Sequence, residues 1–582
     1  MCLHYRQTIN NNPPSSILVV PAHEPGRGGG HRVRCIKLAE ELRQFNIDVC
    51  LYDPATSKEN LSDKDWKCII LDRFKTAPQE LASWKKLSVV IGIDEGGPCR
   101  DSFDFLIDIL PNLCSIAPNI FDPSLLPLPE NKQKTLPAAG CPLKVLASFG
   151  QEDAAGLGSA VSKILAEKKG IELTVTKGNS IPNLSDHLHE YDLLITHYGI
   201  TAFEALYAGT GVILVNPTKY HEKLSKAAGF FTSSVKNLKV NLPVDLPFVE
   251  KIKNRCKELS KRYNLDHEPN MSLAQFISGF SPNVSRNCRV CGSPLHTVSI
   301  ARFSDRTYRR CSRCGIINMD RLTEQPVKYG KDYFFEQYRR QYGKTYLEDF
   351  PNLISVSKRR LKVIRQWAGG RGQGAVDSLL DIGCAYGAFL QAAKEEGYSP
   401  FGIDPCEEAV NFVQKELGIP ALQANFPLPS NLLSITPYPL PLTHYSIITL
   451  WYVIEHFQDC VSALAQIKKI LKPGGILAFS TPSFSGISGR SSQKRYLGKS
   501  PADHFTVWPT ASCKKALRMA GFSIKRIINT GHHPERFPFL GKFAKNRKSP
   551  LYWLLLAISR IFSLGDTYEV YAVAIDIMSA TV

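Results

Sequence analysis

Apolar segments alternate with amphipathic segments in three separate stretches of this 582-residue chain. Within residues 16–110, the strand-like runs SILVVPA and DVCLYD flank the helix-like run HRVRCIKLAEELRQF. The alternation restarts with LKVLASFG after a proline-rich linker, and it restarts again with SLLDIGCAYGAFL. Strands that alternate with helices form parallel sheets covered by helices. The predicted fold class is therefore an α/β multidomain chain with three Rossmann-like units.

The breaks between these stretches predict five parts. Residues 1–135 and 136–280 form two α/β lobes, and residues 281–325 form a small module with four cysteines. Residues 326–375 form a helical connector that is rich in aromatic and basic residues, and residues 376–582 form the third α/β unit. Because a linker joins the first two lobes, we expect a ligand to bind between them.

The cysteines and the start of the chain indicate the cellular compartment in which the protein is expected. The chain has 16 cysteines, but MCLHYRQTINNNPPSS at its start lacks the pattern of a secretory signal. No run of about 18 apolar residues is present to span a membrane. We therefore expect a cytoplasmic protein, in which cysteines stay reduced or bind metal.

Four cysteines have the spacing of a metal site. Two residues separate Cys288 from Cys291, 19 separate Cys291 from Cys311, and two separate Cys311 from Cys314. Two CxxC pairs at this distance are typical of a zinc ribbon. Four thiolates leave no open position on a tetrahedral ion, so the sequence predicts a structural Zn²⁺ rather than a catalytic one.

The excess of positive charge is concentrated near these cysteines. The net charge of the chain is +18, and residues 281–370 contain 18 Lys and Arg against 7 Asp and Glu. Such a segment is either a nucleic-acid contact or a solvated surface between domains. The sequence leaves both interpretations open.

A glycine-rich loop lies between the first strand and the first helix. In PGRGGGHRVRCIKLAEEL, three glycines precede His31 at the start of the helix. Glycines allow the backbone to approach a ligand, and a helix N-terminus attracts an anion. A phosphate site and an ordinary glycine-rich turn both fit the spacing.

This N-terminal half resembles a known family. GGGHRVRCIKLAEEL is similar to the GxGHxxRCxxLAxxL segment of the nucleotide-sugar hydrolase of pseudaminic acid biosynthesis, a relative of the MurG-like glycosyltransferases with the GT-B fold. DLLITHYGITAFEALYAGTGVILV resembles the nucleotide-binding segment of that family. The resemblance implies that His31 is catalytic, that Gly30, Gly150 and Thr201 surround a diphosphate, and that Glu204 binds the ribose.

The third unit opens with the signature of a nucleoside site. In LLDIGCAYGAFL, Asp381 and Gly383 end a strand and Gly387 begins a helix. A second strand ends in the acid Asp404 about twenty residues later. Glycines permit close approach of the backbone, and the acid is placed to accept the hydroxyls of a ribose.

These segments resemble class I S-adenosylmethionine-dependent methyltransferases. The resemblance extends through YSIITLWYVIEHF and LKPGGILAFSTP to the end of the chain. It implies that Gly383, Cys384 and Gly387 shape the loop around the methionine part of S-adenosylmethionine. It also implies that Asp404 binds the ribose and that Asn425 lies by the adenine.

Two histidines are candidate general bases for methyl transfer. His456 follows Glu455 after the fourth strand of the unit, and His504 lies in a loop between prolines. A histidine with a pKa near neutrality can take a proton from a hydroxyl nucleophile. A structural role for each histidine is the alternative.

The favoured function is a methyltransferase that acts on a sugar, nucleotide-sugar or glycan intermediate, fused to a nucleotide-sugar hydrolase or glycosyltransferase-like domain of polysaccharide biosynthesis. One alternative is an RNA methyltransferase that grips nucleic acid through the basic cysteine segment. Another is that the N-terminal half only binds substrate.

The tail FLGKFAKNRKSPLYWLLLAISRIFSL has four basic residues ahead of an apolar helix. Peripheral contact with a membrane is one interpretation of it. A helix buried between the last two strands is the interpretation that the sequence favours.

Overall fold

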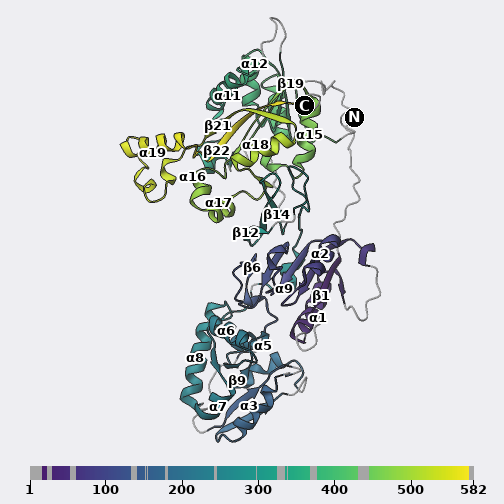
Figure 1. Cartoon of the computed structure of the whole chain (residues 1–582), viewed down its shortest axis with the longest axis vertical. Coiled ribbons are helices and arrows are strands. Elements are labelled where there is room, and N and C mark those ends of the chain that lie inside the picture. The colour runs from purple at the N-terminus through teal and green to yellow at the C-terminus, as the bar shows by residue number, and fades with distance from the viewer. Residues whose placement is uncertain are drawn as a thin grey trace. The chain divides into compact units, whose positions relative to one another are not determined.

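The computed structural model divides the chain into two compact units, and the α/β multidomain prediction is confirmed (Figure 1). The N-terminal unit contains residues 1–284, 302–307 and 321–324, and the C-terminal unit contains the rest. The structure describes residues 16–22, 29–52, 61–130, 132, 141–150, 153, 155–176, 181–241, 245–269, 271–295, 298–323, 335–336, 338–367, 377–429 and 445–575.

The first sheet of the N-terminal unit has six strands in the order β2-β1-β3-β4-β5-β6, all parallel. Successive residues of β1 enter different cores, because side chains alternate between the two faces of a strand. The elements are β1 (Ser16–Pro21), α1 (Gly29–Gln44), β2 (Asp48–Leu51), β3 (Trp66–Asp72), α2 (Pro78–Leu87), β4 (Val90–Ile93), β5 (Phe105–Asp108) and β6 (Ile120–Phe121).

The second sheet of this unit has five parallel strands in the order β11-β10-β9-β7-β8. Its strands are β7 (Leu143–Ala147), β8 (Ile171–Val175), β9 (Leu193–Thr196), β10 (Gly211–Val215) and β11 (Phe231–Ser233). Its helices include α3 (Leu157–Ala166), α5 (Ile200–Ala208), α6 (Lys219–Ala228), α8 (Leu246–Arg262) and α9 (Leu273–Ser278).

The C-terminal unit has a seven-stranded sheet in the order β17-β16-β15-β18-β19-β22-β21. Its strands are parallel except β22, which runs antiparallel to both neighbours. The strands are β15 (Ser378–Ile382), β16 (Ser399–Asp404), β17 (Ala421–Gln423), β18 (Tyr445–Trp451), β19 (Leu471–Pro482), β21 (Phe522–Thr530) and β22 (Thr567–Ala574).

Helices cover both faces of this sheet (Figure 1). Leu379 packs in one core with α11, α12 and α13, whereas its neighbour Leu380 packs in another with α15 and α18. Both faces are therefore buried, as a parallel sheet requires. The helices are α11 (Phe350–Arg365), α12 (Ala388–Glu395), α13 (Glu407–Lys415), α15 (Cys460–Ile470), α16 (Ile487–Ser491), α17 (Gln493–Lys499), α18 (Thr510–Met519) and α19 (Pro550–Ile561).

The cysteine segment contributes three strands of a four-stranded sheet, β12 (Ser299–Phe303), β13 (Arg306–Arg310) and β14 (Ile317–Arg321). The fourth strand is β20 (Thr506–Val507), which directly follows the loop that contains His504. Ile317 pairs with Val507, and Met319 N–H donates to the carbonyl of Phe505 at 2.9 Å. The cysteine segment thus fixes the chain immediately after that loop.

None of the described helices is long and apolar enough to cross a membrane.

Candidate functional site

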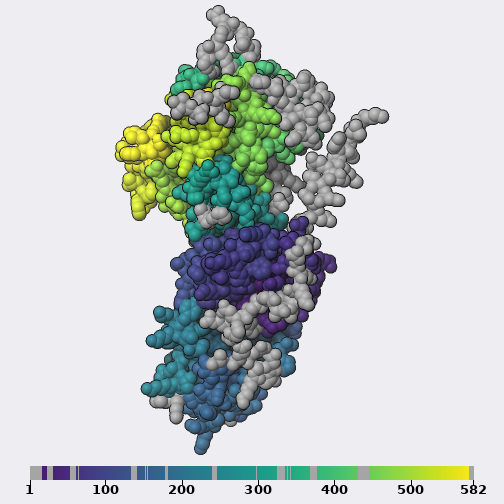
Figure 2. Space-filling view, turned by 45° about the vertical axis from the view of Figure 1, so that its right-hand side comes forward, coloured from purple at the N-terminus to yellow at the C-terminus, as the bar shows by residue number. Residues whose placement is uncertain are grey.

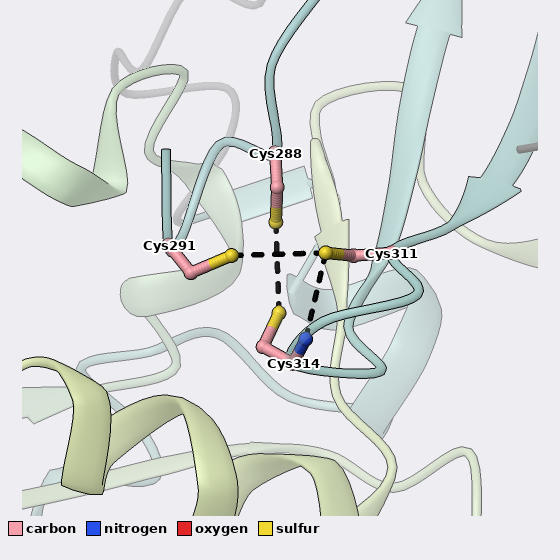
Figure 3. A group of neighbouring side chains, drawn as sticks. All are labelled: Cys288, Cys291, Cys311 and Cys314. Atoms are coloured by element: carbon pink, nitrogen blue, oxygen red, sulfur yellow. Dashed lines mark hydrogen bonds between the residues drawn. The ribbon is translucent and has the colours of Figure 1, made fainter. Parts of the chain in front are cut away.

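The four cysteines lie together in the C-terminal unit, with their sulfur atoms facing one another (Figure 3). The Sγ atoms of Cys288 and Cys314 are 3.6 Å apart, and those of Cys291 and Cys311 are 3.7 Å apart. Ligands about 2.3 Å from a tetrahedral Zn²⁺ are about 3.8 Å from each other, whereas a disulfide needs about 2.05 Å. The geometry fits zinc, and all four cysteines are free thiols.

A glycine follows each CxxC pair and closes its turn. Gly292 and Gly315 have positive φ, 68° and 83°, and their N–H groups donate to the carbonyls of Cys288 and Cys311 at 2.9 Å. Because only glycine adopts this conformation without strain, each turn is fixed locally. Sequence reasoning used the cysteine spacing and missed this repeated CxxCG signal.

The loop after β15, residues 383–387, is closely packed. We call it the donor loop, because the sequence predicts that it binds the methyl donor. Gly383 and Gly387 have positive φ, 74° and 80°. A Cβ on Gly383 would lie 2.4 Å from Val453 Cγ2, and a Cβ on Gly387 would lie 2.8 Å from Val413 Cγ2. The buried Cys384 donates its N–H to the carbonyl of Ile403 at 3.1 Å, which ties the loop to β16.

The two predicted acids flank this loop, and both are buried. Asp404 accepts hydrogen bonds from the N–H groups of Ala385 at 2.8 Å and Cys406 at 2.9 Å, and burial raises its pKa. Asp381 accepts a hydrogen bond from Thr449 Oγ1 at 2.6 Å, and burial raises its pKa to about 7. Asp404 therefore braces the loop and lies where a ribose is expected to bind.

Asn425 is exposed and follows the edge strand β17. The preceding residue, Ala424, donates its N–H to the carbonyl of Asp404 at 3.1 Å, so the backbone runs beside the acid. The proposed adenine contact of Asn425 stays a prediction.

Aromatic residues from the connector pack on the donor loop. The Tyr386 ring in this loop lies 6.0 Å from Phe335, 5.9 Å from Tyr346 and 5.3 Å from Phe412, measured between ring centroids. Tyr346 is desolvated, and burial raises its pKa. These rings therefore cover the loop at Tyr386.

His456 and His504 meet at the carboxyl end of β18. Their rings are perpendicular, with centroids 4.7 Å apart. His456 Nδ1 lies 3.0 Å from a carboxylate oxygen of Asp503. Burial acts to lower the pKa of His456, but the hydrogen bond to Asp503 and the charge of Glu455 outweigh it and raise the pKa above 6.5.

Glu455 is fully buried beside this pair. Neither of its carboxylate oxygens has a hydrogen-bond partner among the described residues, and burial raises its pKa to about 7. Glu455, His456 and His504 offer ligand atoms within 4.8 Å of one another, so they could also hold a metal ion. Sequence reasoning missed Asp503, because nothing in the local pattern links it to His456.

A large cavity opens beside His504. Its volume is about 1390 Å³, and the ends of β19, β21 and β22 contribute to its wall together with α11 and α17. This is the carboxyl edge of the parallel strands, where ligands bind in open α/β sheets. The wall also contains Tyr452, which directly follows β18 and has a positive φ of 62°.

The acids in the wall of the cavity are all paired. Glu569 accepts from Arg360 at 2.8 Å, Asp566 accepts from Arg536 at 2.8 Å, and Glu535 lies 2.9 Å from His533. Three further cations line the cavity without an acidic partner within 4.0 Å among the described residues. They are Arg359, Arg495 and Lys499.

The N-terminal unit has a second cluster, at the end of β3. His31 Nδ1 lies 2.6 Å from the buried Asp72, which also accepts two hydrogen bonds from Arg34 at 2.6 and 2.7 Å. Arg34 forms an ion pair with Asp94 at 2.8 Å. Burial opposes ionisation of Asp72, but Arg34 and His31 hold its pKa well below the usual range. The carboxylate thus orients His31 with Nε2 pointing away from Asp72.

The other predicted residues of this unit lie near two helix starts. A Cβ on Gly30 would lie 3.8 Å from Ile200 Cδ1, so the first turn of α1 adjoins that of α5, where Thr201 lies. A Cβ on Gly150 would lie 3.6 Å from His197 Nε2. Glu204 is buried in α5, and burial raises its pKa to about 7.

Comparisons with known proteins agree on the C-terminal unit. Residues 337–526 match the family model described as a methyltransferase domain. A ubiquinone biosynthesis O-methyltransferase of Nitrosospira multiformis is 24% identical over 194 residues, which are 32% of this chain and 77% of that protein. The enzyme of the same name from Histophilus somni is 31% identical over 137 residues, 23% of this chain and 55% of that protein.

A solved structure described as a SAM dependent methyltransferase from Archaeoglobus fulgidus aligns with 41% of this chain and 98% of its own. Its identity to this chain is 17%, and the TM-score is 0.29. The family match, taken with the named relatives, shows a methyltransferase domain within the C-terminal unit of this chain.

Proposed function

We propose that the C-terminal unit methylates a hydroxyl group of a phosphorylated sugar, such as a nucleotide-sugar or a glycan intermediate. The composition of the cavity beside His504 is the main support for this proposal. Three of its cations have no acidic partner within 4.0 Å among the described residues, whereas its acids are paired. Phosphate groups bind to Arg and Lys through charge-assisted hydrogen bonds. An anionic acceptor matches a wall of this composition better than a neutral one does.

The donor loop is suited to hold S-adenosylmethionine, which when bound supplies a methyl group on a positively charged sulfur. Gly383 and Gly387 take the positive φ that the turn of this loop requires, and Asp404 is placed to accept the ribose hydroxyls. Asp404 keeps lone pairs for the ribose, since each carboxylate oxygen accepts one backbone hydrogen bond. The main contribution of the site is to align the acceptor with the methyl group.

His504 in the cavity wall is placed to take the proton of the acceptor hydroxyl. His456 lies behind it and is oriented by Asp503. In methyl transfer to a hydroxyl, S-adenosylmethionine would supply the methyl group, and His504 would hold the proton that the hydroxyl loses. The relatives are named as O-methyltransferases, which supports a hydroxyl acceptor.

The arginines of the cysteine segment argue against the nucleic-acid alternative. Arg289, Arg302, Arg309 and Arg321 are buried, and Arg309 is paired with the buried Asp320. Arg302 donates to backbone carbonyls within the N-terminal unit. These four of the 18 basic residues in residues 281–370 are therefore buried and not free to contact RNA.

The N-terminal unit is proposed to process a nucleotide-sugar at His31. The Asp72–His31 pair has the arrangement of a general base held by a carboxylate. The adjoining starts of α1 and α5 offer N–H groups for a diphosphate, and Glu204 supplies a carboxylate for a ribose.

The cysteine cluster is proposed to hold a structural Zn²⁺. Its four thiols fit a closed tetrahedral site, and its strand β14 positions β20 next to His504. Its role in methyl transfer is then to position the loop that contains the base.

Neutralising the cavity cations tests the acceptor class. Arg495→Gln with Lys499→Gln should raise KM for a uridine or cytidine diphosphate sugar about tenfold or more, because charge-assisted bonds to phosphate are lost. Affinity for S-adenosylmethionine should not change. The measurement is transfer of labelled methyl with mass analysis of the product. Lys494→Gln on the same helix is the control, since Lys494 does not line the cavity. The proposal would be refuted if the native protein methylated neutral acceptors or RNA, and if Arg495→Gln with Lys499→Gln left the KM for that acceptor unchanged.

The pH profile tests the histidine pair. His504 can take the proton only when its partner His456 is not protonated, so kcat should rise with pH as His456 loses its proton, and Asp503 and Glu455 raise the pKa of His456 above its usual value. Asp503→Asn removes part of this stabilisation of the protonated form, so the midpoint should move toward acid. Asp459→Asn, which removes a nearby charge but keeps the oxygen that caps a helix, is the control. A midpoint that stays in place in Asp503→Asn contradicts the role of the pair.

Loss of the metal tests the structural role of the cysteines. Cys311→Ser should release zinc, lower Tm and reduce kcat for methyl transfer about 100-fold, because His504 loses its position. The Kd for S-adenosylmethionine, measured calorimetrically, should change little, since the donor loop lies on other strands. Cys141→Ser at an exposed cysteine is the control. Full methyl transfer by the zinc-free protein would show that the cluster does not support the site.

Removal of His31 tests the N-terminal unit. His31→Ala should reduce nucleotide-sugar turnover about 100-fold or more while nucleotide-sugar binding persists. His187→Ala, at an exposed histidine of the same unit, should leave turnover unchanged. If the native protein binds nucleotide-sugars but never turns them over, the unit is a binding module instead.

A further inference from the structure

The segment between β21 and β22 exposes an unusual amount of apolar surface. Elsewhere among the described residues, only Val33 and Val298 are large hydrophobic residues with more than half of their surface exposed. This segment contains six large hydrophobic residues that are more than half exposed, and together we call them the α19 face. They are Phe539 (90%), Phe543 (64%), Trp553 (58%), Leu554 (58%), Ile561 (75%) and Phe562 (64%). The expectation of a buried helix is therefore wrong for one side of α19.

The exposed residues of α19 form a stripe. With 3.6 residues per turn, Trp553, Leu554 and Ile561 fall within an arc of roughly 100°. Leu555, Leu556 and Ser559 lie on the other side and are buried. The helix is thus apolar on both sides, and only one of them is covered by the protein.

The buried side anchors the helix to the C-terminal unit. Ser559 Oγ lies 2.7 Å from Nδ1 of His532, and the carbonyl of Ser559 accepts the N–H of Leu564 at 2.8 Å. Figure 1 shows α19 standing away from the seven-stranded sheet, and in Figure 2 this part of the chain (yellow) lies at the edge of the unit. The stripe is therefore presented at a fixed place.

Positive charge surrounds the apolar residues. The exposed cations are Lys542, Lys545, Arg547, Lys548 and Arg560. No acidic residue occurs from residue 537 to residue 565. A second copy of this face would bring like charges together, so self-association through it is disfavoured. An anionic surface that also accepts aromatic side chains matches both properties.

We propose that the α19 face docks on the surface of an anionic lipid bilayer. Trp and Phe side chains insert at the level of the headgroups, and Lys and Arg are attracted by the negative surface potential. The helix has 12 residues, and none of the described helices is long enough to cross a membrane, so the contact is peripheral.

The face continues from the rim of the acceptor cavity. Phe537 and Pro538 line the cavity, and the exposed Phe539 follows them directly. Docking therefore brings one side of the cavity mouth toward the lipid. This placement is independent of the identity of the acceptor.

Vesicle binding of the full chain tests the proposal. Vesicles of phosphatidylcholine with phosphatidylglycerol are compared with phosphatidylcholine alone by co-sedimentation at low and high salt. We expect binding to the anionic vesicles that weakens with salt. Phe543→Ser with Trp553→Ser should reduce binding about tenfold or more, as should Lys545→Gln with Arg547→Gln and Lys548→Gln.

Two matched controls keep the test specific. Trp367→Ser removes an exposed tryptophan elsewhere in the unit, and Lys514→Gln with Lys515→Gln and Arg518→Gln removes three exposed cations on α18. Both should bind vesicles like the native protein. Brominated lipid should quench native fluorescence more than that of Trp553→Phe. Absence of binding, equal loss in the controls, or a native dimer that Phe543→Ser with Trp553→Ser dissociates would overturn the proposal.

Discussion

The pairing of β14 with β20 is the constraint on which the acceptor side of the methyltransferase depends. Residues 317–318 pair with residues 506–507, so the cysteine module holds the chain that contains Asp503 and His504. Arg289, next to Cys288, donates to the carbonyl of Gln458, which follows His456 by two residues. The module thus grips both segments that supply the histidine pair. Because a small sheet of this kind has little core of its own, we expect a Zn²⁺ held by the four thiolates to supply the stability that it lacks.

The parts that could be predicted from sequence are those that local chemistry determines. The spacing of the glycines after β15 and of the acid that ends β16 predicted that these residues meet, and Ala385 in that loop donates its N–H to Asp404. The spacing of the two CxxC pairs likewise predicted that the four cysteines lie together. The parallel arrangement of most strands in the seven-stranded sheet was also predicted, because the strands alternate with helices along the chain.

The parts that could not be predicted join residues that are distant in the sequence. Asp72 orients His31 from a different strand, and Asp503 reaches His456 from a separate loop. Neither pair leaves a local pattern. Charge counting also misled, because it treated Arg302 and Arg309 as surface charges although the fold buries both. Burial depends on tertiary packing, which composition does not record.

The hydrogen bonds of the Asp404 carboxylate have a consequence for the conformation of the donor loop. Two backbone N–H groups, from Ala385 on one side and Cys406 on the other, donate to its two oxygens. The aromatic rings of Phe335 and Phe412 pack against Tyr386 in the same loop. Because these contacts are all made by the protein itself, we expect them to order the loop before a donor binds. Donor binding would then cost little conformational entropy.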